Sequence, residues 1–408
     1  MSTIHDTTYT FLTADNIVDY VAARPALAAR VDPGAIELVE EIGDGNLNLV
    51  FRVRDRKGSS LILKQALPYV RMTGEGWPMT PERARHEAES LKVHHDAAPD
   101  LVVETLLYDD ENYVLALEDL GDHTVWRTAL NQGLRHEGAA AATGRYVAAV
   151  AIDCSVLGQD RTVVAEQIAR HQNPELCTIT EDLVFTEPSF DAGRNSVLPG
   201  NESDAIALAA DPAFRAAMGE AKWRFMTRAE TLIHGDLHTG SIMVRGTSGA
   251  VESLKVFDSE FAFYGPIAFD LGQLYANYTF AAARAIAVSD ERQARWCLNL
   301  PTETWAAFAG ELRARIDAGH SRALWDRVFI DQRLGQLERE TWLFAAAELA
   351  RRTVGAAKVS DIETLPPAQR VEAARALLLA ARAVAAKWDT PHELADWAAT
   401  VLPLLKTR

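Results

Sequence analysis

The chain has few cysteines and a shortage of positive charge, and both deficits limit what it can be. Its three cysteines, Cys154, Cys177 and Cys297, are too far apart in sequence for a disulfide framework or a metal-ligand pattern. Such usage fits a reducing compartment, so a cytoplasmic location is expected. With 41 basic and 57 acidic residues the formal net charge is -16, which repels nucleic acid and anionic membranes. Neither is expected as a partner.

Long apolar runs are also missing. The N-terminus has no basic region followed by an apolar core, so no signal peptide is expected. The most apolar late segment, residues 371–388, is interrupted by Arg375, Arg382 and Lys387, which predicts a soluble helix and not a membrane span. Hydrophobic residues make up 48% of the chain and charged residues 24%, an ordinary globular mix. The 408 residues are enough for two or more domains.

The first 120 residues have the pattern of a small α+β lobe. Apolar, partly alternating runs with glycine-containing turns indicate strands, and Thr80-Pro81 indicates the start of an amphipathic helix. Strands are expected over residues 36–42, 49–54, 60–67, 102–108 and 112–117, and helices over residues 13–30 and 81–95. Five strands with one inserted helix favour a small lobe with an antiparallel sheet, residues 1–120.

Residues 121–408 have the pattern of a larger, mostly helical lobe. Ala-rich amphipathic runs predict helices over residues 144–171, 203–228, 302–317, 331–358 and 367–387. Short strands are expected over residues 241–244 and 253–257, on either side of a turn. The boundary between the lobes is expected at residues 118–121.

Three carboxylates on two short loops suggest phosphoryl transfer. Asp236 follows an apolar run, and Asp258 and Glu260 come after a second one, with Asp258 22 residues beyond Asp236. Transfer through a loose transition state needs mainly positioning, so Asp236 is the candidate base or orienter of an attacking hydroxyl. Residues two apart in an extended segment point the same way. Asp258 and Glu260 are therefore candidate ligands of Mg²⁺, which prefers oxygen.

Each of these carboxylates also has an ordinary structural interpretation. Asp236 alone fits the cap of a turn, and Asp258 and Glu260 alone fit a solvated strand edge. Only their combination favours a metal and phosphate site. His234 is expected to be a structural histidine that hydrogen-bonds the backbone, whereas the role of His238 stays open between phosphate contact and structure.

A glycine turn between two predicted strands is a candidate phosphate loop. Gly43, Gly45 and Asn46 would let the backbone N–H groups approach a nucleotide, although an ordinary hairpin turn predicts the same residues. The sequence has no G-x-x-x-x-G-K-[ST] motif, which disfavours a P-loop fold.

The lysine at the end of Leu-Ile-Leu-Lys on the third expected strand is the stronger nucleotide signal. Lys64 follows the glycine turn at the spacing where a kinase lysine contacts the α- and β-phosphates of ATP. It needs an acidic partner on the next helix. Glu87 and Glu89 are the candidates, about 200° apart on a helix, so only one can face inward. Glu87 is preferred.

Together these motifs resemble the protein-kinase-like fold in its aminoglycoside-phosphotransferase-type branch, and in detail the family of 5-methylthioribose kinases. The resemblance includes the motifs Asp-Leu-His-Thr-Gly-Ser and Glu-Phe-Ala-Phe-Tyr-Gly-Pro, which are specific and not general features of kinases. It rests on residues 41–48, 63–69, 76–80, 82–85, 234–243, 258–266 and 269–270, and later on 350–352.

The resemblance implies a two-lobed enzyme that phosphorylates the anomeric hydroxyl of 5-methylthioribose with ATP, within methionine salvage. It also implies a homodimer and adenine held near residues 118–120, which are Glu118, Asp119 and Leu120. An arginine pair, Arg351 and Arg352, would lie near the ribose hydroxyls and the transferred phosphate, where the guanidinium fork suits paired oxygens. Without the resemblance a solvated basic patch would be the favoured interpretation of the pair.

Two departures from the wider kinase pattern bear on the metal site. The usual catalytic-loop asparagine is replaced by Ser241, a poorer ligand, and the usual Asp-Phe-Gly by Asp-Ser-Glu. Glu260 can supply the oxygen ligand for Mg²⁺ that Ser241 does not supply. The 5-methylthioribose kinases resemble this sequence in both respects, but more often carry proline where Ser259 stands.

Some alternatives remain open. Trp77, on a glycine-punctuated loop, is a candidate to close over the nucleotide or sugar, or else to pack against the following helix. The acceptor is alternatively an aminoglycoside, choline or another deoxy-pentose, since an acidic surface suits a cation. A nucleotide-binding pseudokinase is disfavoured because Lys64, Asp236, Asp258 and Glu260 are all present.

Overall fold

The computed structural model describes residues 9–42, 47–69, 76, 78–247, 249–320, 324–393 and 395–407. The chain forms two compact units. The first runs up to Asp122 and also includes the short segment Asp258–Phe261. The second consists of His123–Phe257 and Ala262–Arg408. A four-residue piece from late in the sequence thus belongs to the N-terminal unit.

The first unit is built on a five-stranded antiparallel sheet with the order β1-β2-β3-β5-β4. Its strands are β1 Ile36–Glu41, β2 Asn48–Asp55, β3 Ser60–Ala66, β4 Thr105–Asp109 and β5 Val114–Glu118. Its helices are α1 Ile17–Ala22, α2 Pro25–Arg30, the single turn η1 Pro33–Ala35, and α3 Arg83–Ala97. The sheet, its five strands and the inserted helix agree with the expected small α+β lobe.

Side chains alternate across the sheet and so separate a core face from a polar face. On β3, Leu61 and Leu63 are fully buried in a cluster with residues of α1 and α2, such as Ile17 and Leu27. Lys64 therefore points to the opposite face, since neighbouring strand residues alternate. The single helix expected over residues 13–30 is wrong, because Pro25 begins a new helix after a break.

The second unit is mostly helical, with short strand pairs. Its long helices are α5 Ala139–Asp153, α9 Pro212–Thr227, α10 Ile267–Ala287, α11 Glu291–Arg315, α12 Arg327–Val354 and α14 Pro367–Lys387. Shorter helical segments are α4 Trp126–Asn131, α6 Arg161–Arg170, α7 Pro174–Thr180, η3 Glu181–Thr186, α8 Glu202–Ala210, η4 Ile316–His320, α13 Ser360–Glu363 and α15 Asp396–Leu405.

The described strands of the second unit form three small sheets, one with three strands and two with two strands. The order β11-β9-β6 and the pair β12-β8 are antiparallel, and β10 pairs with β7 in parallel. Their bounds are β6 Thr124–Val125, β7 His136–Glu137, β8 Thr231–Ile233, β9 Ile242–Arg245, β10 Gly249–Ala250, β11 Ser253–Val256 and β12 Phe263–Gly265. The loops after β8 and β11 carry Asp236 and Asp258.

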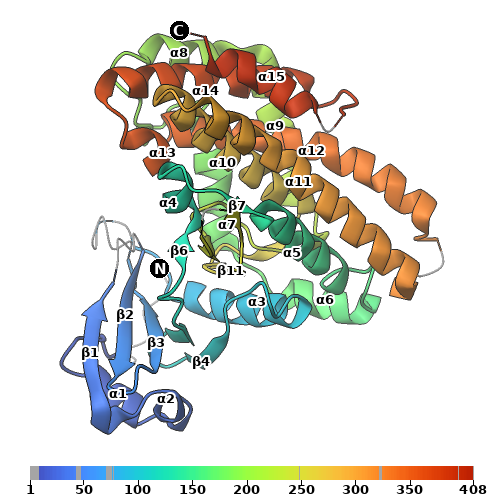
Figure 1. The fold of residues 1–408 in the computed structure, drawn as a ribbon. Helices are drawn as coiled ribbons and strands as arrows, with labels where there is room; N and C mark the ends of the chain where they lie inside the picture. Colours follow the sequence, from blue (N-terminus) through green and yellow to red (C-terminus); the bar gives the residue numbers. More distant parts are fainter. Residues whose placement is uncertain are drawn as a thin grey trace. The chain divides into compact units, whose positions relative to one another are not determined.

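Helix α10 is the centre of the second unit. It is buried from Ile267 through Ala283, and it packs against α5, α11, α12 and α14 (Figure 1). The close approach of α12 depends on Gly272, because a Cβ there would lie 2.7 Å from the Cβ of Phe344. The sequence analysis did not predict α10, although Asp270, Gln273 and Asn277 recur along it at the spacing of one helix face.

Two predicted helices are each split in the structure. The helix expected over residues 144–171 is α5 and α6 with a turn between them, and that over residues 203–228 breaks at Asp211-Pro212 into α8 and α9. Asp211 caps α9 by accepting from the backbone N–H of Ala213. The overall class, α+β with one sheet-based unit and one helical unit, is confirmed. Among the described residues, no helix combines the length and the apolar character that crossing a bilayer requires.

Candidate functional site

Lys64 is held in the first unit by two carboxylates. Its ammonium lies 2.7 Å from Glu87 of α3 and also bonds Asp258, which belongs to the same unit. Glu87 lies on the buried stripe of α3, whereas Glu89 lies on the outer side and pairs with Arg85 at 3.2 Å. The preference for Glu87 over Glu89 as the partner of Lys64 agrees with these contacts, while their role toward a nucleotide stays a prediction.

Three carboxylates gather around this lysine. Ligand oxygens of Glu87, Asp258 and Glu260 all lie within 4.8 Å of one another. Glu87 and Glu260 are buried, and the Asp258 side chain is 42% exposed. A group of oxygen ligands with one accessible member is chemically suited to Mg²⁺.

The charges of this cluster are unbalanced. Burial raises the pKa of Glu87 and that of Glu260, and the neighbouring carboxylates raise both further, although Lys64 opposes the shift. Burial alone would lower the pKa of Lys64, but Asp258 and Glu87 outweigh it and raise that pKa. The surplus of buried negative charge would be relieved by a divalent cation.

The backbone around Asp258 differs from the expected extended segment. Asp258 has φ 69°, in the left-handed region that is uncommon for residues other than glycine. The two carboxylates therefore do not point the same way through strand alternation. They approach each other because the chain turns after β11, and this local strain at a polar cluster is typical of functional sites.

Buried side chains of the first unit fix the turn. Asn48 donates a hydrogen bond of 3.1 Å to Glu260, and the Arg83 guanidinium lies 3.7 Å from the same carboxylate. Ser90 of α3 bonds the hydroxyl of Ser259 at 2.7 Å. The serine between the two acidic residues is thus anchored by a side-chain contact that proline at this position would lack.

The loop after β8 is held in shape by Asp270 of α10. Its carboxylate accepts from the backbone N–H groups of His234 at 2.8 Å and Gly235 at 3.1 Å. The ring of His234 donates from Nε2 to the carbonyl of Phe257 at 2.9 Å and faces the Asp236 N–H with Nδ1. His234 is therefore a structural residue that hydrogen-bonds the backbone, as expected.

Asp236 lies at the end of this loop among hydrogen-bond donors. Its Oδ1 accepts from Arg351 at 2.9 Å, from Gln273 at 3.3 Å and from Arg352 at 3.4 Å. Its Oδ2 lies 3.2 Å from Nε2 of His238. Burial alone would raise the pKa of Asp236, but these neighbours outweigh it and hold that pKa well below its usual value. The carboxylate is therefore ionised at neutral pH.

His238 is a neutral donor to Asp236. Its Nδ1 accepts from the backbone N–H of Gly240 at 3.0 Å, so the ring proton is on Nε2, which faces Asp236. Burial lowers the pKa of His238 to about 4, and the nearby Arg127 and Arg352 lower it while Asp236 opposes them. Ser241 bonds the Asp236 carbonyl at 2.8 Å, which occupies its hydroxyl within the loop.

The arginine pair on α12 is not a solvated patch. The side chains of Arg351 and Arg352 are 11% and 8% exposed, and both donate from Nε to the buried carboxylate of Glu348. Burial would raise the pKa of Glu348, but the two arginines outweigh it and lower that pKa. The structure thus brings both predicted arginines to Asp236 within the second unit.

Other predicted residues are accounted for less fully. Gly43, Gly45, Asn46 and Trp77 lie outside the described residues, so their roles stay predictions. Glu118 is the last residue of β5, and Asp119 and Leu120 follow it. Glu118 accepts a hydrogen bond from the N–H of Glu104 at 2.9 Å, and Asp119 pairs with Arg52 at 3.1 Å. Leu120 is buried. Their proximity to adenine also stays a prediction.

Sequence reasoning missed several residues that shape the two groups. They are Asn48 and Arg83 in the first unit, and Asp270, Gln273 and Glu348 in the second. A signal for Glu348 was available, because it precedes the arginine pair by three and four residues, the spacing of neighbours on one helix face. Asp270 lies within the matched Phe-Asp motif, but the motif alone does not show what its carboxylate binds.

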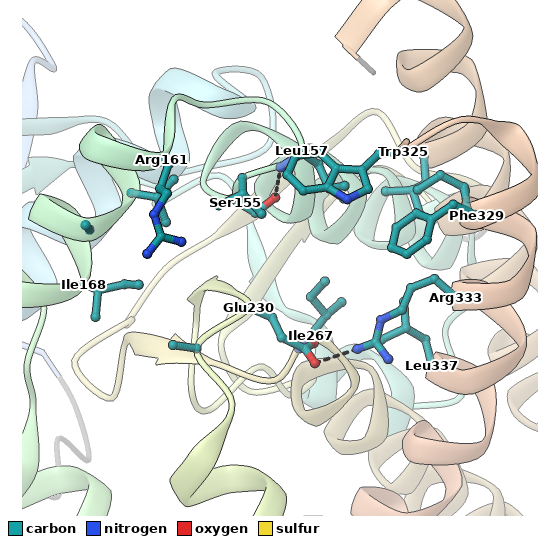
Figure 2. A pocket seen from close by; sticks show the side chains of 16 residues that line it. Ser155, Leu157, Arg161, Ile168, Glu230, Ile267, Trp325, Phe329, Arg333 and Leu337 are labelled. Carbon is teal, nitrogen blue, oxygen red and sulfur yellow. Dashed lines mark hydrogen bonds and ion pairs between the residues drawn. The ribbon is translucent and has the colours of Figure 1, made fainter. Parts of the chain in front are cut away.

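The second unit also contains an apolar cavity of about 470 Å³ that none of the residues around Asp236 lines. Trp325, Phe329 and Leu337 lie on one side, and the Glu230–Arg333 ion pair crosses its polar end (Figure 2). Glu230 and Arg333 offset each other's charge there, and Arg161 also lines the cavity.

Comparison with known proteins identifies the family. The phosphotransferase enzyme family matches residues 38–310. The methylthioribose kinase of Yersinia pseudotuberculosis serotype O:3 is 40% identical over 367 residues, covering 88% of this chain and 87% of the relative. The methylthioribose kinase of Pectobacterium atrosepticum is 39% identical, covering 88% and 89%. A choline/ethanolamine kinase family protein from Mesorhizobium loti is 15% identical, with a TM-score of 0.45 and coverage of 97% and 100%.

The two sequence relatives match nearly the whole chain, through both units. At this identity and coverage, the expected protein-kinase-like phosphotransferase fold is confirmed. The chain belongs to the phosphotransferase enzyme family and, within it, to the family of the methylthioribose kinases.

Proposed function

We propose that this protein transfers the γ-phosphate of ATP to the anomeric hydroxyl of 5-methylthioribose, as a step of methionine salvage. The family and the names of its relatives support the reaction and the acceptor. The two groups of charged residues support a division of work, with nucleotide contacts in the first unit and acceptor contacts in the second.

The group around Lys64 would hold the nucleotide phosphates. The ammonium would bind the α- and β-phosphate oxygens, and Glu87 would keep it in place through the 2.7 Å ion pair. Asp258 and Glu260 would hold Mg²⁺, and their oxygen ligands and surplus negative charge fit that ion. When bound, Mg²⁺ neutralises the charge on the phosphate oxygens.

Asp236 would orient the acceptor hydroxyl. A carboxylate whose pKa lies well below the usual value is a weak proton acceptor, so its main contribution is a directed hydrogen bond to the attacking O–H. A loose transition state leaves the proton on the hydroxyl until late, so an orienter is sufficient. The Nε2–H of His238 and the Gln273 amide hold the carboxylate for this task.

One observation carries the choice of acceptor class: two buried arginines touch the carboxylate that would orient the acceptor. Their guanidinium groups favour an oxygen-rich, uncharged sugar that becomes a phosphate ester, and they disfavour a cationic amine. The acidic surface of the whole chain, which suits a cationic acceptor, does not extend to this buried group.

We also propose Mg²⁺ dependence, a cytoplasmic location and a homodimer. The cysteines support the reducing compartment, since Cys154, Cys177 and Cys297 form no disulfide within the described part of the chain. The dimer rests on the resemblance to the family, and light scattering of the purified protein tests it.

An acceptor panel tests the reaction. Purified protein with ATP and Mg²⁺ should release ADP fastest with 5-methylthioribose, compared with ribose, choline and an aminoglycoside. NMR of the product should show a phosphate on the anomeric carbon. Preference for a cationic amine would exclude the proposed acceptor, and ATP binding without ADP release for any acceptor would indicate a pseudokinase.

A further inference from the structure

Glu348 has a position that the proposed reaction does not yet use. It lies on α12 with 1% of its side chain exposed, and its two oxygens are divided between the arginines. Oε2 accepts from Nε of Arg351, and Oε1 accepts from Nε of Arg352 at 2.9 Å. One carboxylate thus fixes the inner end of both guanidinium groups.

The outer ends of the same groups converge on Asp236. Nη2 of Arg351 and Nη2 of Arg352 lie 2.9 Å and 3.4 Å from the same oxygen, Oδ1. Nη1 of neither arginine donates to another residue in the described part of the chain, so these two atoms alone offer four N–H groups to an incoming oxygen.

Neighbouring residues of a helix point about 100° apart, so Arg351 and Arg352 do not share a direction by default. The two guanidinium groups are both positively charged and donate to the same oxygen of Asp236, so they also repel each other. A buried carboxylate three and four residues earlier on the helix corrects both problems, because it lies between the two stems and carries the opposite charge.

We propose that Glu348 is a positioning residue for phosphoryl transfer, which holds Arg351 and Arg352 so that their Nη groups meet at Asp236 and the acceptor oxygen. This inference rests on the proposed function. A misplacement of about 1 Å at a reacting group costs on the order of 100-fold in rate, so loss of this anchor should reduce turnover.

Helix α12 offers a matched control for Glu348. Glu340 is also buried, at 3% exposure, and it also accepts from arginines, Arg224 and Arg228. It has no contact with Asp236 or with the arginine pair among the interactions of the described residues. A purely structural role would make Glu348→Gln and Glu340→Gln behave alike.

The test compares kcat, the KM of each substrate and Tm for the two variants. Glu348→Gln should lower kcat by roughly tenfold or more with the KM of ATP unchanged, while Glu340→Gln should lower Tm and leave kcat within about twofold. Equal effects of the two substitutions on kcat, or unchanged kcat in Glu348→Gln, would overturn the proposal.

A double-mutant cycle shows whether Glu348 acts through the arginines. In an Arg351→Lys background, which lacks the Nε anchor, Glu348→Gln should cost much less in kcat than it does in the wild type. Fully additive losses would contradict the inference. If Glu348→Gln does not fold, Glu348→Asp takes its place, because it keeps the charge but is too short to bond both Nε groups.

The wild-type assay separates this proposal from the proposed function. The cycle is measured with whichever acceptor of the panel the wild type phosphorylates fastest. If that acceptor is not 5-methylthioribose, the proposed function fails, while the non-additivity of Glu348 and Arg351 still decides the positioning role.

Discussion

The group around Lys64 in the first unit and the group around Asp236 in the second are both assemblies of buried carboxylates and cations. In the first, three carboxylates surround one lysine, and burial raises the pKa of Glu87 and of Glu260. In the second, arginines and a histidine surround one half-buried aspartate, whose pKa falls although burial opposes the shift. The same side-chain chemistry thus gives opposite shifts, set by which charge is in excess.

The difference indicates what each group accepts. An excess of carboxylates with raised pKa values is prepared for a cation that is not part of the protein. An excess of N–H donors around a fully ionised carboxylate is prepared for neutral or anionic oxygens. Phosphoryl transfer needs both kinds of surface, one for a magnesium–nucleotide complex and one for a hydroxyl.

The largest effect is expected from removing the charge of Asp236. Asp236→Asn should lower kcat by about 10²–10⁴-fold, because a neutral amide accepts a weaker hydrogen bond from the hydroxyl than a carboxylate does and cannot take up its proton late in the transfer. ATP affinity, measured by calorimetry, should be unchanged, since the proposed nucleotide contacts belong to the first unit. Normal turnover in this variant would refute the role of Asp236 and with it the contrast between the two groups.

Removing the lysine of the first group should cost stability as well as activity. Lys64→Met leaves the buried carboxylate of Glu87 without its cation, and breaking a buried pair in this way costs about 3–5 kcal/mol. Urea unfolding measures the change. The matched control is Glu89→Gln on the outer side of α3, whose pair with Arg85 is worth less than about 1 kcal/mol.

Equal effects of Lys64→Met and Glu89→Gln would contradict the description of the first group as a cluster in need of cations.

Magnesium should stabilise the wild-type protein by binding the carboxylate cluster. At about one hundred times the dissociation constant, the expected gain is about 2.7 kcal/mol, and EDTA should reverse it. Asp258→Asn should lose most of this Mg²⁺-dependent rise in thermal stability. Asp236→Asn is the control and should keep it, because Asp236 is not among the cluster's ligands. The same Mg²⁺ response in both variants would place the ion elsewhere.

The sequence singled out central residues of both groups but not the geometry that brings them together. Lys64, Asp236, Asp258 and Glu260 follow from motif and spacing, but the turn at Asp258 does not, because a left-handed non-glycine residue leaves no local signal. Glu348 was missed although its spacing from Arg351 and Arg352 is a local signal, because the sequence alone does not show that its side chain is buried.

The fold shows a similar limit. Helix α14 was predicted with its observed bounds, because Pro366-Pro367 marks its start and neither glycine nor proline interrupts the rest of the helix. Helix α10 was not predicted, although Asp270, Gln273 and Asn277 recur along it at the spacing of one helix face. The element that holds the loop of Asp236, through Asp270, was therefore missed even though its sequence is periodic.

The smallest predicted effect concerns the histidine beside Asp236. The pKa of His238 falls from 6.5 to about 4 in the folded protein, so the unfolded chain binds a proton first as the pH drops. The associated stability is fully present above pH 6.5 and is lost as the pH falls toward 4. From pH 7 to pH 5.5 the free energy of unfolding should decrease by about 1 kcal/mol because of this residue.

His238→Gln keeps a donor for Asp236 but cannot take up a proton. The difference in unfolding free energy between wild type and variant should therefore change by about 1 kcal/mol between pH 7 and pH 5.5, in favour of the variant. Urea titrations at the two pH values measure it. A constant difference would mean that His238 is not held neutral by burial and the neighbouring arginines, and that the excess of positive charge around Asp236 is smaller than the contacts indicate.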